Sequence, residues 1–242
     1  MKTLYESLLD DNLVDKTDEM IIKDEIETFL KANYKCKGSI KISEKPNKDD
    51  LYEVSSTSAI EVKNTNINSL TNGMFIWTTV DGGFYCNNCK FLKSLEGAPK
   101  KVGGGFYCYS CNSLTSLKGA PKEVGDDFYC NLNISLKSLE GAPKEISGDF
   151  SCVNCRSLKS LEGAPKKARR NFDCSMCDSL TSLEGAPKEV GGTFSCSNCN
   201  SLTSLEGAPK EVGGYFYCLR CTNCFTIEDV KKVSNVKGKI RC

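Results

Sequence analysis

Large apolar residues recur along most of this chain with a period of 22 residues. A phenylalanine stands two residues before a cysteine in every repeat, and a leucine follows nine residues after the cysteine, until Ile227 takes that place. A fixed period of this size is typical of a solenoid, in which each coil buries its apolar face only against its neighbours. We therefore predict a right-handed repeat solenoid, mainly β with short turns, with seven clear coils from residue 84. The two leading columns are Phe84, Phe106, Phe128, Phe150, Phe172, Phe194 and Phe216, and Cys86, Cys108, Cys130, Cys152, Cys174, Cys196 and Cys218.

One coil, residues 194–212, shows how each position is used. Phe194 and Cys196 are two residues apart, so a strand places both on one face and Ser195 on the other. We expect the phenylalanines to stack inward and the leucines to line a returning arc. The Gly-Ala-Pro triplet that follows predicts a corner, because glycine permits positive φ and proline fixes φ. The lysine after each proline is expected to point outward.

The two ends of the chain depart from the repeat. We predict a flexible acidic segment at 1–16, an α/β cap at 17–58, the solenoid at 59–226 with a degenerate first coil, and a closing cap at 227–242. Within the first cap, Thr17 is the predicted N-cap of a helix over 17–34, and Ile40/Ile42, Tyr52/Val54 and Ile60/Val62 each mark a short strand. The helix presents the apolar stripe Met20, Ile22, Ile26, Phe29, Leu30 and Tyr34. Two interpretations of the first 16 residues remain open: a frayed chain end, or a docking peptide built on Leu4, Tyr5, Leu8 and Leu9.

A second column of cysteines lies three residues after the first, with asparagine in the third coil. Repeated C-x-x-C pairs are typical of zinc or iron–sulfur sites. The inward position of the first cysteine, the exchange for Asn and the continuous column favour structural thiols. Disulfides between coils remain an alternative, because strand spacing of about 4.8 Å falls inside the Cα window for a bridge. The second column is Cys89, Cys111, Asn133, Cys155, Cys177, Cys199 and Cys221.

The motif F-x-C-x-x-C-x-x-L-x-x-L, as in residues 194–205, resembles the core of leucine-rich repeats. The resemblance covers roughly 84–226 and implies that the Cys/Asn column forms an inward ladder, hydrogen-bonded to the backbone of the returning loop. It departs from that family in having Phe where Leu is usual. The repeated SLEGAPKEVGG and the opening MKTLYESLLDD also resemble reading frames of gut bacteria and their phages.

Composition narrows the classes of function. The chain has no histidine, and its 32 basic residues balance 31 acidic ones, with only five arginines. Histidine is the commonest general base and metal ligand, so we expect no enzyme activity, no metal and no cofactor. Nucleic acid recognition favours a net basic surface, so we expect no nucleic acid partner. No stretch fits a signal peptide or a membrane span, which predicts a protein without membrane contact that is cytoplasmic, or in the host cytoplasm or virion if it is phage-encoded.

Candidate binding residues point outward beside the phenylalanine strand. Two tyrosine patches surround a polar centre, and tyrosine is enriched in protein interfaces, although strand propensity alone also favours tyrosine there. The segment of residues 166–171 adds a basic departure from the repeat, where Arg169 and Arg170 replace two glycines; the alternative is neutral drift in a loop. These residues are Tyr85, Tyr107, Tyr109, Tyr129, Asp173, Tyr215, Tyr217, Arg169 and Arg170.

Three functions are compatible with this pattern. The first is a non-catalytic module or scaffold that displays a rigid strand face to another protein. The second is a structural component of a phage virion or other particle, attached through its N-terminal segment. The third, ranked behind both, is a C-x-x-C metal protein. No small-molecule substrate is expected.

Overall fold

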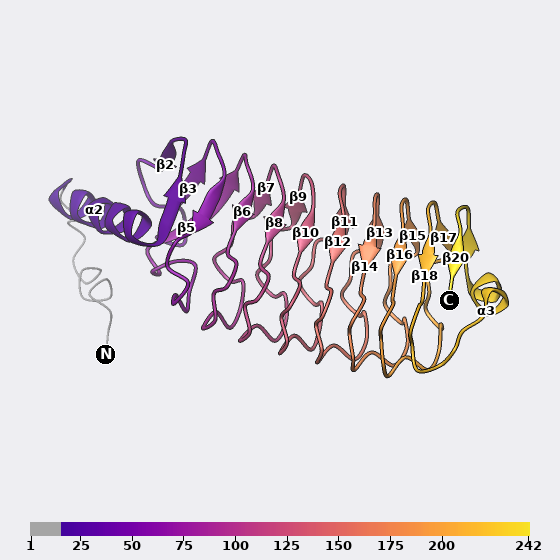
Figure 1. The fold of residues 1–242 in the computed structure, drawn as a ribbon. Helices are drawn as coiled ribbons and strands as arrows, with labels where there is room; N and C mark the ends of the chain where they lie inside the picture. Colours follow the sequence, from indigo (N-terminus) through magenta and orange to yellow (C-terminus); the bar gives the residue numbers. More distant parts are fainter. Residues whose placement is uncertain (1–15) are drawn as a thin grey trace.

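The computed structural model describes residues 16–242, which form a parallel β-solenoid of about nine turns with about 22 residues in each. Figure 1 shows the coils stacked in a row from the N-terminal helix to the C-terminal end. The predicted mainly β solenoid is confirmed. Residues 1–15, with the predicted docking peptide Leu4, Tyr5, Leu8 and Leu9, lie outside the described residues. Within residues 16–242, no helix is both long and apolar enough to span a membrane.

Each coil contributes one short strand to a ten-stranded sheet. Its strands pair in parallel with equivalent residues side by side, except that β1 is antiparallel to β4. Phe128, for example, lies between Phe106 and Phe150. The 22-residue period is therefore the register of this sheet. Its strands are β1 (Tyr34–Cys36), β4 (Ile60–Val62), β6 (Phe84–Tyr85), β8 (Phe106–Tyr107), β10 (Phe128–Tyr129), β12 (Phe150–Ser151), β14 (Phe172–Asp173), β16 (Phe194–Ser195), β18 (Phe216–Tyr217) and β20 (Ile240–Arg241).

A second strand in each coil was not predicted. It comes from the Lys-Glu-Val segment, which the sequence pattern assigns to the end of the returning arc. Two residues are too few to show a period of two, and such strands form only because neighbouring coils align them. Together with the predicted strands β2 and β3, and with β5 and β19, they make two five-stranded sheets. The first is β2 (Ile40–Ile42), β3 (Tyr52–Ser56), β5 (Phe75–Val80), β7 (Lys101–Val102) and β9 (Glu123–Val124); the second is β11 (Glu145–Ile146), β13 (Lys167–Ala168), β15 (Glu189–Val190), β17 (Glu211–Val212) and β19 (Asn235–Val236).

The core is a continuous column of stacked phenylalanine rings. All seven repeat phenylalanines have no exposed surface, and consecutive ring centroids lie 5.1 to 5.7 Å apart. In the coil of residues 194–212, Leu202, Leu205 and Val212 complete the apolar set and are buried, as predicted. Each buried phenylalanine contributes roughly 1.5–3 kcal/mol relative to exposure, so this column is a major source of stability.

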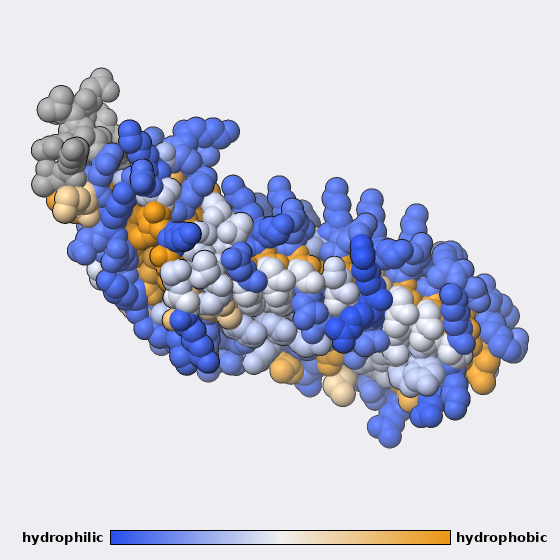
Figure 2. Space-filling model, turned by 90° about the horizontal axis from the view of Figure 1, so that it is seen from above, coloured by the Kyte–Doolittle hydropathy of each residue, from blue (hydrophilic) through white to orange (hydrophobic). Residues whose placement is uncertain are grey.

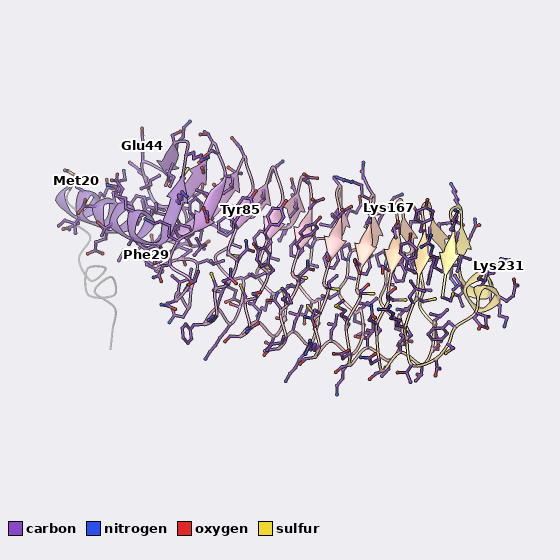
Figure 3. The ribbon with its side chains drawn as sticks, in the orientation of Figure 1. Met20, Phe29, Glu44, Tyr85, Lys167 and Lys231 are labelled. Carbon is purple, nitrogen blue, oxygen red and sulfur yellow. The ribbon has the colours of Figure 1, made fainter. Side chains whose placement is uncertain are left out.

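The N-terminal cap forms one residue earlier than predicted. Helix α2 (Lys16–Asn33) begins before Thr17, so Thr17 lies in its first turn rather than at its N-cap, and Tyr34 starts β1. Ile26 and Leu30 are buried against the coils, whereas Met20 is 71 % exposed. Figure 3 places Met20 at the end of the helix that is remote from the coils, and Phe29 at the end beside them. The coils therefore cover the C-terminal part of the apolar stripe and leave Met20 exposed.

The regular stacking starts earlier than residue 59. Strands β3 and β4 already pair in parallel with β5 and β6, so the solenoid takes in about residue 52 onward. Ile60, rather than Val62, lies opposite Phe84, because the first coil is two residues longer than the others. Val80 pairs with Val102 as the period predicts.

The closing cap contains a short helix that the repeat pattern does not predict. Helix α3 (Ile227–Val233) begins at Thr226, whose hydroxyl accepts a hydrogen bond from the backbone N–H of Asp229 while the Asp229 carboxylate accepts one from the N–H of Thr226. This reciprocal capping satisfies two amides at the helix start. Strands β19 and β20 then pair with β17 and β18, so the cap is itself a final coil.

The Gly-Ala-Pro corners follow the prediction. The glycine of every triplet has φ between 83° and 101°, and a Cβ on Gly119 would lie 2.2 Å from the backbone nitrogen of Glu96 in the preceding coil. The lysine after each proline is exposed. These corners therefore require glycine for both its conformation and its lack of a side chain.

Candidate functional site: the tyrosine-bearing strand face

The outward column of the first-strand row is arranged as the sequence predicts. Its members lie side by side in consecutive coils, from the pair Tyr85 and Tyr107 to the pair Ser195 and Tyr217. We call this column, together with the residues just before the phenylalanines, the strand face. The outward column comprises Tyr85, Tyr107, Tyr129, Ser151, Asp173, Ser195 and Tyr217.

The first tyrosine patch is a stack whose geometry is set by glycine. The rings of Tyr85 and Tyr107 are parallel within 2° with centroids 4.7 Å apart. A Cβ on Gly105 would lie 2.5 Å from the phenol oxygen of Tyr107, so the ring covers the glycine of its own coil. In the next coil this position is Asp127, and the ring of Tyr129 stands at 89° to that of Tyr107. The residue before each phenylalanine thus decides how its tyrosine lies.

Tyr109 and Tyr215 flank the outward column as predicted. Tyr109 is 37 % exposed, and its backbone N–H donates to the Asn87 side chain at 3.1 Å. Tyr215 is 43 % exposed, and its ring centroid lies 5.7 Å from that of Tyr217. The tyrosines therefore form one patch near the N-terminal coils and another near the C-terminal end.

A ladder of polar side chains joins the two patches, and it was not predicted. Asp127 Oδ1 accepts from the backbone N–H of Asp149 at 2.7 Å, Asp149 Oδ1 accepts from that of Asn171 at 2.9 Å, and Asn171 Oδ1 accepts from that of Thr193 at 2.7 Å. Each side chain is held by the next coil, so little rotamer freedom remains to be lost on binding. The signal that could have found this ladder is the loss of glycine at one repeat position.

The phenols beside the ladder remain protonated at neutral pH. Burial, together with the Asp127 and Asp149 carboxylates, raises the pKa of Tyr129 to about 12. The Tyr129 hydroxyl donates to Asp149 Oδ2 at 3.5 Å. Burial, with Tyr85 and Asp127 nearby, also raises the pKa of Tyr107. These groups can therefore donate hydrogen bonds to a partner.

The centre of the strand face is hollowed into a groove of about 510 Å³. Tyr129 and Tyr217 line it together with Asp149, Asn171 and Thr193 of the ladder. Asp173 also lines it, and its Oδ1 accepts from the backbone N–H of Ser175 at 2.9 Å. Figure 2 shows a pale band of intermediate hydropathy along the length of the molecule, between hydrophilic side chains. The groove is thus polar and acidic inside and aromatic at both ends.

Arg170 belongs to this acidic centre and does not form a free basic patch. Its guanidinium lies 3.6 Å from Asp149 Oδ1, 3.7 Å from Asp126 Oδ1 and 3.9 Å from Asp127 Oδ1. Lys167 in the same coil is paired with Glu189, and Figure 3 places it along the edge of the coils. Arg169 is exposed. The predicted grip on an acidic partner is therefore not supported for Arg170, whose charge is used within the chain.

The two cysteine columns are structural in their geometry. The first column, Cys86 to Cys218, and the second, Cys89 to Cys221, are buried throughout. Burial raises the pKa of the Cys108 and Cys174 thiols well above the ordinary value, which disfavours the thiolate that metals and nucleophilic chemistry require. In residues 16–242, no group of three or more Cys, Asp or Glu side chains is placed to hold a metal ion.

The second column forms the hydrogen-bonded ladder that the resemblance implies, with different acceptors. The thiols of Cys155, Cys177 and Cys199 donate to the carbonyls of Cys130, Cys152 and Cys174 at 3.2–3.3 Å. These carbonyls end the strand of the preceding coil, rather than belonging to the returning loop. The ladder therefore ties each coil to the one before it.

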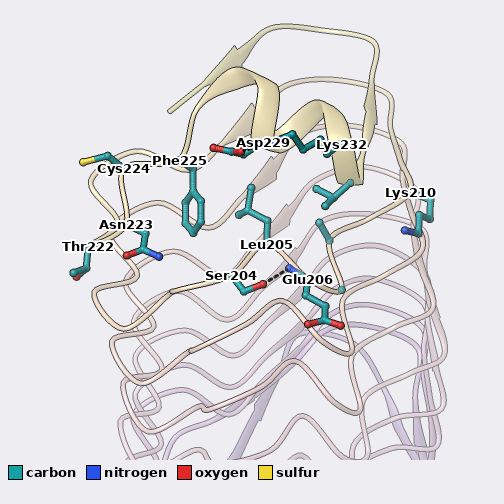
Figure 4. Close-up of a pocket in the computed structure, with 13 residues that line it drawn as sticks. Ser204, Leu205, Glu206, Lys210, Thr222, Asn223, Cys224, Phe225, Asp229 and Lys232 are labelled. Carbon is teal, nitrogen blue, oxygen red and sulfur yellow. Dashed lines mark hydrogen bonds and ion pairs between the residues drawn. The ribbon is translucent and has the colours of Figure 1, made fainter.

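A second hollow of about 680 Å³ lies at the C-terminal end, between α3 and the last regular coil. Figure 4 shows Phe225 pointing into it and Cys224 pointing away, with Glu206 and Lys210 toward its rim. Asp229, the third residue of α3, is engaged by Thr226 and Lys232. The hollow follows from the departure of the chain from the repeat, and the Asp229 and Lys232 side chains that line it are paired with each other.

Comparison of the chain with protein-family models, curated proteins and solved structures finds no match.

Proposed function

We propose that this solenoid is a non-catalytic recognition module, which binds an extended, basic segment of another protein along its strand face. The observation that carries the proposal is the groove itself: an acidic centre fixed by the polar ladder, with Tyr129 at one end and Tyr217 at the other. The columns of Phe, Cys/Asn and Leu support a repeat of leucine-rich type.

Charge favours a basic occupant. Asp149 and Asp173 line the groove, and beside it Asp126, Asp127 and Asp149 share one guanidinium, that of Arg170. The chain already uses these carboxylates to hold one arginine, and the remaining negative charge favours a second cation. Tyrosine rings at both ends add surfaces on which a cation or an apolar side chain can pack.

The dimensions favour an extended segment. Tyr129 and Tyr217 are four coils apart, which at about 4.8 Å per strand is roughly 19 Å. An extended peptide of about six residues spans that distance. Because the ladder is ordered before binding, the ordering cost falls mainly on the partner.

The test is selection from a display library of random hexapeptides on the immobilised full chain. We expect enrichment of Arg- or Lys-containing sequences. The double variant Tyr107→Ala with Tyr129→Ala should weaken their capture at least about tenfold with a thermal midpoint close to that of the wild type, because both phenols lie outside the core.

The matched charge control compares two double variants. Asp149→Asn with Asp173→Asn removes two carboxylates from the groove, and Glu145→Gln with Glu184→Gln removes two exposed carboxylates elsewhere. Only the first pair should reduce capture. Enrichment of acidic or uncharged peptides, no enrichment, or equal loss in both double variants would overturn the proposal.

A further inference from the structure

At the C-terminal end of the first cysteine column, two thiols are in contact. The sulfur atoms of Cys218 and Cys242 lie 3.1 Å apart. The pairing of β18 with β20 places them there, since Phe216 lies opposite Ile240, Tyr217 lies opposite Arg241, and the backbone N–H of Cys218 donates to the carbonyl of Arg241 at 2.9 Å. Adjacent parallel strands are about 4.8 Å apart, which lies within the Cα separations that disulfides span.

This cysteine pair differs from the inner cysteines of the column in its solvent exposure. Cys152 has no exposed surface and lies between two neighbouring coils that hold its backbone. Cys242 is exposed and directly follows strand β20, which is the outermost of the ten-stranded sheet. Edge strands adjust more easily than central ones, so the small approach needed for a bond costs least here.

We propose that Cys218 and Cys242 are an oxidisable pair, whose disulfide fastens the closing coil under oxidising conditions. The bridge spans 24 positions of the chain and encloses α3 and β19. It would covalently join the outermost strand to the regular coils at the end where a solenoid frays most readily.

A low-molecular-weight disulfide such as oxidised glutathione supplies the oxidant. The Cys242 thiolate attacks one glutathione sulfur, forming a mixed disulfide and releasing one glutathione thiolate. The Cys218 thiolate then attacks the Cys242 sulfur and releases the second glutathione. The two cysteines lose two electrons and two protons, and the glutathione disulfide gains both as two thiols.

The test is incubation of the folded full chain with oxidised glutathione, followed by denaturation and alkylation. The untreated chain has 16 thiols. We expect two fewer after treatment. Cleavage after lysine should yield residues 240–242 joined to residues 211–231, and further cleavage after Arg220 should leave Cys242 attached to the fragment that holds Cys218 rather than Cys221 or Cys224.

Two variants and one physical readout complete the experiment. Cys242→Ser should retain all its remaining thiols, whereas Cys224→Ser, which removes another exposed cysteine, should cross-link like the wild type. The amides of β20 should exchange at least about tenfold more slowly in the oxidised chain. A persistent glutathione adduct at Cys242, a bridge to Cys221 or Cys224, an intermolecular dimer, or unchanged exchange would each overturn the inference.

Discussion

The side-chain amide of Asn133 donates to the carbonyl of Cys108 at 2.9 Å, in the place where Cys111 donates its thiol to the carbonyl of Cys86 at 3.0 Å. The asparagine does more than the thiol. It also donates to the carbonyl of Cys130 at 3.0 Å and accepts from the backbone N–H of Cys111 at 2.7 Å. One fully buried amide therefore ties two coils together at two points and makes a third hydrogen bond within its own coil.

Asn133→Leu should be strongly destabilising. The substitution leaves the N–H of Cys111 and the carbonyls it faced buried without their partner, which should lower the free energy of unfolding by about 2–4 kcal/mol. Chemical denaturation measures the change. Asn133→Cys restores the pattern of the other coils and should cost about half as much or less; an equal loss in the two variants would show that the hydrogen bonds are not the cause.

Removing backbone strain at the left-handed position between the two cysteine columns should stabilise the chain. Leu132 and Met176 have φ of 61° and are 43 % and 46 % exposed. In three other coils the equivalent left-handed position is an asparagine, namely Asn88, Asn154 and Asn198. Asparagine adopts this conformation at lower cost, so Leu132→Asn or Met176→Asn should each raise the free energy of unfolding by about 0.5–1 kcal/mol. The reverse change, Asn198→Leu, is the control and should lower it by a similar amount. The prediction would be contradicted if the denaturation midpoints of the forward and reverse variants did not shift in opposite directions.

The corner glycines should tolerate no side chain. Gly119→Ala combines a φ of 88° with a Cβ 2.2 Å from Glu96 N, so we expect a loss of more than about 2 kcal/mol. Gly73 has nearly the same φ, 86°, with nothing within 4 Å of its Cβ. Gly73→Ala should therefore cost only about 1 kcal/mol, the conformational part alone. Thermal unfolding of the two variants separates close packing from backbone strain; similar losses would show that packing matters little.

The Tyr129 phenol should make stability fall at high pH. Its pKa is about 12 in the folded chain and about 10 for an ordinary tyrosine. Between these values the unfolded chain loses the proton while the folded chain keeps it, so this contribution is present below about pH 10 and is lost as pH rises toward 12. Tyr129→Phe should show a shallower decline over that window. Denaturant unfolding at several pH values measures the difference, and Asp149→Asn should fall between the two, because one of the carboxylates that raise the pKa is removed.

The repeat positions needed no tertiary information. Inward Phe and Cys, outward Tyr and Lys, and the Gly-Ala-Pro corner all follow from the requirement that every coil present the same face to its neighbour. Where a coil differs from its siblings, the same reasoning fails. The pattern treats Arg170 as a free cation, yet acids from the two preceding coils surround it.

The ends were the least predictable part for the same reason. Met20 continues the apolar stripe of its helix, but the helix extends beyond the first coil and leaves Met20 uncovered. Helix α3 replaces a returning arc through a capping interaction at Thr226 that no period could reveal.

The sequence by itself determined the solenoid, its register and its core, because a solenoid contact always joins residues one period apart. Only the tertiary structure decided which unlike residues meet across coils: Asp149 with Tyr129 and Arg170, and Cys218 with Cys242. Such contacts depend on side-chain direction, on the register at the ends and on the local absence of a Cβ. The period determines which positions are neighbours, and the side chains at those positions determine which contacts form.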